Sequence, residues 1–381
     1  MFEEPENNNL ATDLRGVGQL SIDAVNGITD IVEALHQTIA SSAGILDKSN
    51  GSRTRGLTRF VYQNVRRTTH LVGAGIDAPL RPLSQRLGDK ESSPAREAVL
   101  AAVNGLLGDH LVAKNNPLAI PMRLRHNGQA VGAQTLAERL APAGSHLVIF
   151  VHGALMNDRQ WQRKGHDHGA ALARDLGLMP LYLHYNSGRH VSENGRLFAQ
   201  LLESFFAQLT QPPTLTLIGF SMGGLVARSA CHYGNMAGHH WLNSLNNLLF
   251  LGTPHHGAPL EKGGNWMGAI MDISPYSSPF ARLGKFRSGG LTDLRYGHVL
   301  DEDWQGRDRF AVHGDQRIPV PLPADVNCFA IAASTSKDAN RVADYLPGDG
   351  LVPLQSALGR HQDSRLDLGI PESRQWVGRP L

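Results

Sequence analysis

A serine lies at the centre of the segment Gly-Phe-Ser-Met-Gly (219–223), a G-x-S-x-G spacing in which a serine hydroxyl can act as a nucleophile. The apolar run Leu-Thr-Leu-Ile before the segment is typical of a strand, and Gly-Gly-Leu-Val-Ala-Arg-Ser-Ala within and after it is typical of a helix. Gly219 and Gly223 leave room for the strand and the helix to approach each other. The pattern predicts that Ser221 sits on a sharp strained turn at the carboxyl end of a sheet, where open α/β sheets bind ligands.

A second segment, Val151-His152-Gly153-Ala154-Leu155, directly follows the strongest apolar run of the sequence. An enzyme that transfers acyl groups must stabilise a tetrahedral oxyanion, and one backbone N–H donor contributes roughly 3–4 kcal/mol to this. We expect the two donors to be the amides of Ala154 and Met222. For the His152 side chain, a buried role in ordering the loop is favoured over a chemical one.

The acid of such a site is expected after a late strand. Asp349 lies between two glycines in Leu-Pro-Gly-Asp-Gly-Leu-Val-Pro (346–353), where an exposed turn would let its carboxylate orient a histidine ring. Asp-Gly is also an ordinary turn dipeptide. Asp338 and Asp344 are alternative acids.

The base is the least defined part of the predicted site. His361 is the only histidine after Asp349 in the sequence, and it lies in a stretch expected to be helical, 355–361, where a solvent-exposed histidine is common. Three alternatives remain: His361 is the base, a histidine from elsewhere is the base, or the chain is truncated before its histidine. In the last case the protein is a catalytically impaired, hydrolase-fold binding protein.

Residues 117–377 resemble the α/β-hydrolase family, and among its members the lipases and the GPI-inositol-deacylase-like esterases. The resemblance is carried by four segments: Ile-Phe-Val-His-Gly (149–153), Ile-Gly-Phe-Ser-Met-Gly-Gly-Leu-Val-Ala-Arg (218–228), Leu-Gly-Thr-Pro-His-His-Gly (251–257) and Gly-Asp-Gly-Leu-Val-Pro (348–353). It implies Ser-His-Asp hydrolysis of a carboxylic ester through an acyl-enzyme, without a cofactor. It also places the base after the last strand, whereas His361 precedes the candidate last strand 374–377.

The elements that must position these residues follow a repeated order of strand, glycine turn and helix. Buried strands are expected at 146–151, 179–184, 215–220, 247–251 and 326–332, a weaker strand at 374–377, and a hairpin at 121–131. The apolar spacing over 197–209 predicts an amphipathic helix. Strands alternating with helices predict an α/β fold with a mostly parallel, doubly wound sheet.

We expect three parts in the chain: an N-terminal helical extension (1–116), an α/β-hydrolase domain (117–381) and, inside that domain, a cap insertion at about 259–323. Apolar residues of the cap favour a lipid-like or otherwise hydrophobic ester as substrate; they are Trp266, Met267, Ile270, Met271 and Phe280. In the extension, helices are expected at 22–39, 57–72 and 94–107. The arginines of 53–72 either contact an anionic membrane surface weakly or form a solvated face.

Composition narrows the possible partners. The chain has 36 Lys+Arg against 34 Asp+Glu, so no nucleic-acid partner is expected. The two cysteines, Cys231 and Cys328, are expected to be buried free thiols in a reducing compartment. The acidic N-terminus lacks the features of a secretory signal, which favours a cytoplasmic protein. His255 and His256 are expected to order their loop or contact substrate, and no metal site is expected. The sequence leaves the oligomeric state open.

Overall fold

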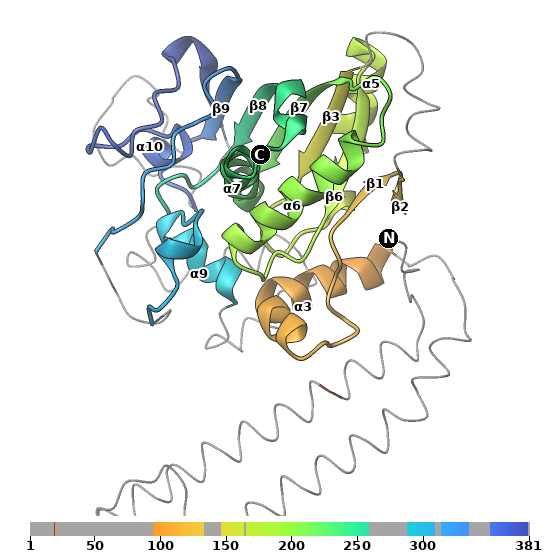
Figure 1. Ribbon diagram of the computed structural model, residues 1–381, viewed down its shortest axis with the longest axis horizontal. Helices are drawn as coiled ribbons and strands as arrows, with labels where there is room; N and C mark the ends of the chain where they lie inside the picture. The colour runs from red at the N-terminus through yellow and green to blue at the C-terminus, as the bar shows by residue number, and fades with distance from the viewer. Residues whose placement is uncertain are drawn as a thin grey trace, which may run out of the picture. The chain divides into compact units, whose positions relative to one another are not determined.

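The computed structural model describes residues 94–132, 146–163, 165–258, 288–308, 314–334 and 351–379, together with Gln19. The chain divides into two compact units, of which the second comprises residues 94–113 and 119–381. Figure 1 labels the helices and strands of this second unit. Every element described below belongs to this second unit. The helices expected at 22–39 and 57–72, and the membrane contact expected at 53–72, lie outside the described residues.

Eight strands of the described part form one sheet, in the order β10-β9-β8-β7-β3-β6-β1-β2. The strands from β10 to β6 run parallel, and β1 pairs antiparallel with both β6 and β2. Their bounds are Arg123–His126 (β1), Gln129–Ala130 (β2), His146–Val151 (β3), Met179–His184 (β6), Thr214–Phe220 (β7), Leu245–Leu251 (β8), Asn327–Ala333 (β9) and Gln375–Gly378 (β10). The mostly parallel sheet predicted from the alternation of strands and helices is confirmed.

The predicted hairpin is also confirmed. Asn127 and Gly128 connect β1 to β2 with φ angles of 52° and 77°. Positive φ at both central residues is what a two-residue hairpin turn requires, and asparagine and glycine adopt it at the lowest cost. A second, two-stranded sheet pairs β4 (Gln162–Arg163) with β5 (His166–Asp167).

The helices are α3 (Pro94–Ala113), α5 (His168–Leu176), α6 (Val191–Phe206), α7 (Met222–Met236), α9 (Gly289–Tyr296) and α10 (Leu354–Ala357). In the described part of the chain, four 3₁₀ turns accompany them: η1 (Asp158–Trp161), η2 (His240–Ser244), η5 (Asp301–Asp303) and η6 (Glu372–Arg374). No helix in the described ranges is both long and apolar enough to cross a membrane.

Helix α3 was assigned from the sequence to the N-terminal extension, yet it belongs to the same compact unit as the sheet. The boundary expected near residue 116 stays a prediction. The helix expected over 355–361 is wrong in its extent, because α10 ends at Ala357 and Gly359, with φ of 72°, turns the chain away from the helix. His361 therefore lies in a loop.

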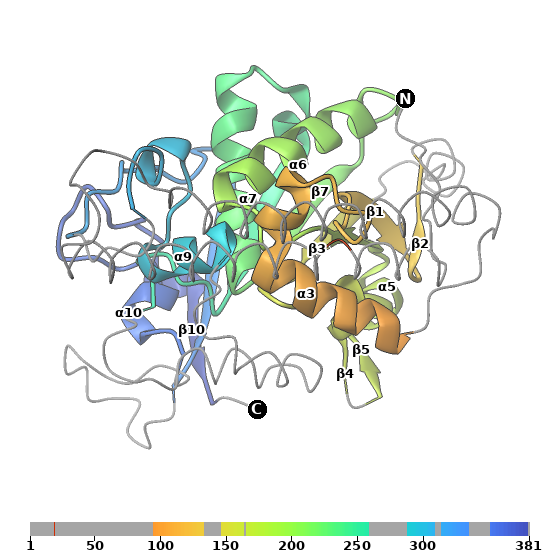
Figure 2. The same ribbon diagram turned by 90° about the horizontal axis from the view of Figure 1, so that it is seen from below.

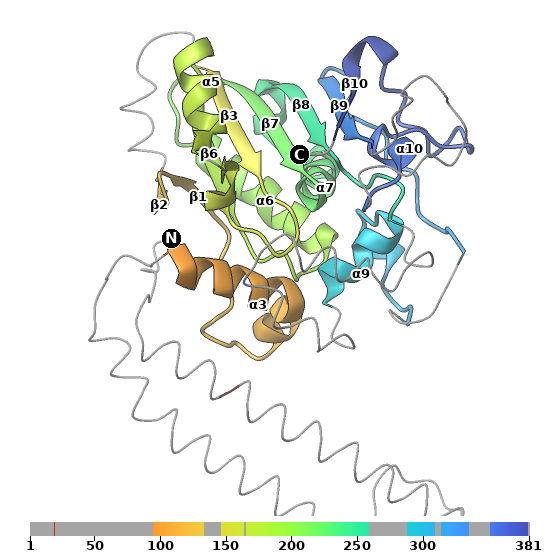
Figure 3. The ribbon, with the colours of Figure 1, turned by 180° about the vertical axis from the view of Figure 1, so that it is seen from behind.

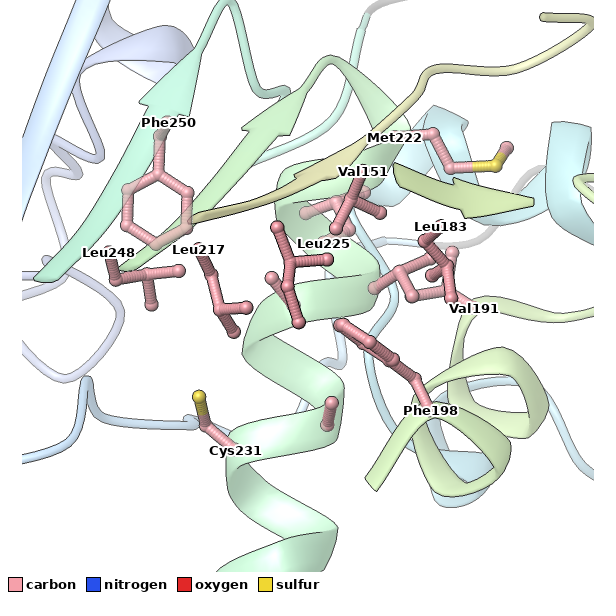
Figure 4. Close-up of a cluster of buried hydrophobic side chains, with 14 of the residues drawn as sticks. Val151, Leu183, Val191, Phe198, Leu217, Met222, Leu225, Cys231, Leu248 and Phe250 are labelled. Atoms are coloured by element: carbon pink, nitrogen blue, oxygen red, sulfur yellow. The ribbon is translucent and has the colours of Figure 1, made fainter. Parts of the chain in front are cut away.

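Each face of the sheet carries its own apolar cluster, because successive side chains of a strand point to opposite faces. Leu147, Ile149 and Val151 of β3 join the larger cluster with α6 and α7, whereas Val148 and Phe150 join a smaller one on the other face. Figure 2 shows α6 and α7 together on one side of the sheet. Side chains of the larger cluster from strands and helices meet in Figure 4.

The two cysteines are buried and form no disulfide, as predicted. Burial raises the pKa of the Cys231 thiol to about 12 and that of Cys328 to about 11. Both thiols are therefore protonated and unreactive near neutral pH.

The core predicts a measurable loss of stability. Phe198 of α6 is fully buried in the larger cluster. Replacing it by alanine (Phe198→Ala) should lower the free energy of unfolding by about 3–5 kcal/mol. The substitution removes apolar contacts and leaves a cavity that the neighbouring side chains fill only in part. Chemical denaturation measures this. The matched control Met236→Ala, at a side chain that is 71% exposed, should change it by less than about 1 kcal/mol.

Candidate active site

The carboxyl ends of three central strands meet at one place on the sheet edge. Val151 of β3 pairs with Gly219 of β7, and Phe220 of β7 pairs with Leu251 of β8. The loops that leave these strands therefore start side by side. The first contains His152–Leu155, the second contains Ser221 and the third contains His255 and His256.

Ser221 lies in a strained turn between β7 and α7. Its φ and ψ are 52° and −121°, a combination that residues with a side chain rarely adopt. The turn is held by hydrogen bonds from the Ser221 amide to the Leu251 carbonyl (2.8 Å) and from the Gly224 amide to the Ser221 carbonyl (3.1 Å). Although Ser221 stands at the N-cap position of α7, its side chain makes no capping hydrogen bond. The hydroxyl is thus left available for other partners.

Two glycines make this turn possible. A Cβ at Gly223 would collide with the carbonyl oxygen of Val151, and one at Gly219 would lie 2.5 Å from the Cα of Gly224. These neighbours are backbone atoms, which cannot rotate away as a flexible side chain could. The first turn of α7 therefore packs directly on the ends of β3 and β7.

The loop after β3 passes over Ser221. A Cβ placed on Gly153 would lie 3.2 Å from the Cβ of Ser221 and 3.3 Å from the Sδ of Met156. Within the described ranges, the amides of Ala154 and Met222 donate no hydrogen bond to another residue. Met222 is also the first residue of α7, where the helix dipole favours negative charge. The structure thus places Gly153, the residue before Ala154, against Ser221, and the roles of the Ala154 and Met222 amides as oxyanion donors stay a prediction.

His152, the first residue of this loop, is fully buried. Its Nδ1 donates to the carbonyl of Gly153 (2.9 Å), and its ring stacks on Tyr185 with 4.2 Å between ring centroids. The Tyr185 hydroxyl in turn donates to the His152 carbonyl (2.7 Å). Burial lowers the pKa of His152 to about 4, so the ring is neutral near pH 7. Tyr185, directly after β6, is a support of the loop that the sequence analysis missed.

The loop after β8 carries two histidines with different surroundings. His255 is fully buried, packs edge-on against Phe250 (4.5 Å between centroids) and lies 3.3 Å from Arg228 Nη1 through its Nδ1. The His256 amide donates to the hydroxyl of Ser356 (3.0 Å). Burial lowers the pKa of His256 to about 3 and also lowers the pKa of His255. Neither ring is protonated near neutral pH.

His361 is the predicted base whose position the structure describes. Its ring packs against His256 (4.8 Å between centroids), its Nε2 lies 3.9 Å from Asp315, and its Nδ1 accepts the amide of Asp363 (3.0 Å). None of these contacts is with Ser221. The predicted acid Asp349 and its alternatives Asp338 and Asp344 lie outside the described residues.

A cavity of about 170 Å³ lies in the part of the expected cap that the structure describes. Its wall includes His190 and Trp304, whose rings are stacked 3.6 Å apart. The fully buried Asp293 holds His190 through Nδ1 (3.0 Å). Ser221 is not among the residues that line this cavity. The apolar cap residues between 266 and 280 lie outside the described residues, so the cap stays a prediction. Among the residues with described positions, no three His, Cys, Asp or Glu side chains are placed to hold a metal ion.

The sequence matches a known α/β domain family, in agreement with the mostly parallel sheet described above. Residues 143–275 match the family model of the PGAP1-like alpha/beta domain. Together with the sheet order, this match confirms the α/β-hydrolase fold and the resemblance to that family. No curated protein matches the sequence.

Three solved structures show weaker similarity. They are the mature form of the Bacillus licheniformis lipase BlEst2 (19% identity, TM-score 0.33, 51% of this chain and 67% of that one), the Aspergillus fumigatus lipase B (13%, 0.37, 62% and 46%) and a lipase-esterase related protein from Clostridium acetobutylicum (12%, 0.31, 68% and 89%). The matched region thus spans less than half of the Aspergillus lipase.

The strain at Ser221 predicts an unusual order of stability. Glycine adopts a positive φ without a steric cost, whereas alanine keeps the Cβ that causes the strain. Ser221→Gly should therefore be more stable than Ser221→Ala by about 1 kcal/mol, the reverse of the order in ordinary structure. Urea denaturation of the two variants measures the difference. If the alanine variant is the more stable one, the turn is not strained.

The buried His152 predicts an acid-sensitive stability. An unfolded histidine titrates near pH 6.5, whereas folded His152 has a pKa of about 4. Between these values the unfolded chain binds more protons, so stability falls as the pH drops from about 6.5 to about 4, by about 3 kcal/mol for this group. The variant His152→Phe should lose less stability over that interval in denaturation curves recorded at several pH values. Equal losses in both proteins would show that His152 does not set this dependence.

Proposed function

We propose that the protein is a serine hydrolase that cleaves carboxylic esters with hydrophobic or lipid-like acyl groups. The observation that carries the proposal is the placement of Ser221 in a strained turn at the start of α7, with the Gly153 loop directly against it. A strained backbone at a non-glycine residue persists only where the surrounding structure imposes it, and such residues cluster at active sites.

The chemistry would proceed through an acyl-enzyme. Ser221 Oγ attacks the ester carbonyl and gives its proton to a base, while the amides of Ala154 and Met222 hold the oxyanion. The tetrahedral intermediate collapses, the base returns the proton to the leaving alcohol, and the acyl group stays on Ser221. Water, deprotonated by the same base, then attacks the acyl carbon. The bond to Ser221 Oγ breaks, the base returns the proton to Oγ, and the carboxylic acid is released. No cofactor takes part in these steps.

The acid and the base belong to the proposal and not to the described geometry. Asp349 is the proposed acid and His361 the candidate base. For His361 to serve, its ring must come within hydrogen-bond distance of Ser221 Oγ. The alternative function is a hydrolase-fold protein that binds an ester or acyl ligand without efficient turnover. It is favoured by the described contacts of the His361 ring, which are with His256, Asp315 and Asp363 and not with Ser221.

Covalent labelling tests the proposal directly. A fluorophosphonate probe should form an adduct on Ser221 that peptide mass spectrometry locates, and p-nitrophenyl butyrate should be hydrolysed. Ser221→Ala should abolish both, whereas Ser204→Ala, on the exposed side of α6, should change neither. Folded wild-type protein without a Ser221 adduct would refute the serine hydrolase.

The same assay separates the candidates for the base. In a comparable serine hydrolase, loss of the base lowers turnover by about six orders of magnitude. A loss of that order in His361→Ala would assign the base to His361, and unchanged turnover would assign it to another histidine. Labelling of Ser221 without ester turnover in the wild type would favour the binding protein.

A further inference from the structure

The backbone of helix α3 lies close to the backbone of the loop after β3 (residues 152–157), here called the oxyanion loop. A Cβ on Gly105 would lie 2.9 Å from the Cα of Leu155, the residue after the proposed donor Ala154. Leu155 is fully buried and has a φ of 61°, so its conformation is imposed by its surroundings. Only a glycine lets the helix approach this closely.

A buried charge network fixes the far end of the same loop. Glu97 of α3 accepts hydrogen bonds from Arg159 Nε (2.6 Å) and from Arg125 (3.4 Å), and Arg125 also contacts Asp158 (3.3 Å). His184 of β6 bonds the same Asp158 oxygen through its Nδ1 (3.0 Å). The side chains of Glu97, Arg125 and Asp158 are at most 5% exposed. Because buried ion pairs need nearly ideal geometry, the network holds Asp158 at a fixed position. Arg159, whose side chain is 36% exposed, is tied to this network through Glu97.

Other bonds hold α3 itself in place. Asn186 Nδ2 donates to the Gly108 carbonyl (3.0 Å), and the Ser288 hydroxyl donates to the Gly105 carbonyl (2.6 Å). The hydroxyl of Ser187 accepts the Leu155 amide (3.1 Å), which links the loop to the segment that also holds α3. Figure 3 shows α3 beside α9, whose N-cap is Ser288.

We propose that α3 is a positioning element of the oxyanion hole, with Gly105 and Glu97 as its positioning residues. The proposal rests on the proposed ester hydrolysis. Oxyanion donors act only when they are preorganised at the developing charge, and a displacement of about 1 Å can lower a rate by about 10²-fold. Gly105 sets the position of Leu155 at one end of the loop, and Glu97 sets that of Arg159 at the other. The Ala154 amide lies in the loop that they hold.

The test is Gly105→Ala in the full chain, with Val99→Ala as the matched control on the exposed side of α3. Turnover of p-nitrophenyl butyrate is expressed per serine titrated by fluorophosphonate, so that unfolded molecules do not count. We expect kcat per titrated serine to fall by roughly 10- to 100-fold in Gly105→Ala, less than the loss of a whole donor. KM should stay within about twofold, and the control should match the wild type.

A transition-state analogue provides a readout that a merely structural role would not change. An alkyl boronic acid forms a tetrahedral adduct with an anionic oxygen, so its inhibition constant should rise by the same factor as kcat falls. Glu97→Gln, which keeps the side-chain volume, should shift both quantities in the same direction and decides the matter if Gly105→Ala does not fold.

The outcomes separate the two proposals. If the wild type neither hydrolyses the ester nor forms the Ser221 adduct, the proposed function fails and the role of α3 fails with it. If the wild type is active and both variants keep wild-type kcat per titrated serine, only the role of α3 is overturned. A rise in KM alone would also overturn it, because α3 would then affect substrate binding and not the oxyanion.

Discussion

The backbone at Ser221 constrains most of what surrounds it. A chain that leaves a buried strand and enters a helix within one residue must turn through a conformation that disfavours any side chain, and here the turning residue is a serine with φ of 52°. The strained conformation is stabilised by the hydrogen bond from the Ser221 amide to the Leu251 carbonyl. It is also stabilised by α7, whose first turn packs against the backbone of Val151. The register of β3, β7 and β8 and the glycines at 219 and 223 are all needed for this one conformation.

The same constraint explains why the loop after β3 needs support. Once the first turn of α7 occupies the space beyond Val151, the chain after β3 must bend over Ser221, and it does so with a buried histidine and a positive φ at Leu155. Such a loop has few helix or sheet hydrogen bonds of its own. Its stability comes from Tyr185 and Ser187 in the segment after β6 and from α3, two segments distant from it in sequence.

The sequence predicted the local parts of this arrangement well. The bounds of β3 and β6 coincide with the expected 146–151 and 179–184, because a strand buried on both faces is a nearly continuous apolar run. The hairpin followed from Asn127-Gly128. What could not be predicted were contacts between distant residues, such as Arg125 with Glu97 and Asp158, 28 and 33 positions away. Charged residues are usually exposed, so no pattern marks these as buried.

The surroundings of His361 also depend on contacts between distant residues, which the sequence does not predict. The residues from Gln355 to His361 have no helix breaker before Gly359, and helix propensity alone extends the helix through them. The structure ends α10 at Ala357, since the chain must turn to bring Leu368 against Gly359 and lead into β10. In that loop His361 gains its neighbours His256 and Asp315 from other segments.

The buried ion pairs around Arg125 contribute more to fixing the positions of their side chains than to the free energy of folding. Moving several charges out of water costs several kcal/mol for each ion, and apolar residues of the same volume would often stabilise the fold more. Apolar contacts, however, tolerate sliding, whereas an ion pair between buried side chains loses its energy when a partner shifts by an ångström. Desolvation alone would raise the pKa of Asp158, yet the hydrogen bond from His184 and the charge of Arg125 lower it. The carboxylate is therefore charged and fixed at neutral pH. If the protein cleaves esters as proposed, a loop that holds one amide against a developing oxyanion depends on such fixed positions more than on a larger core.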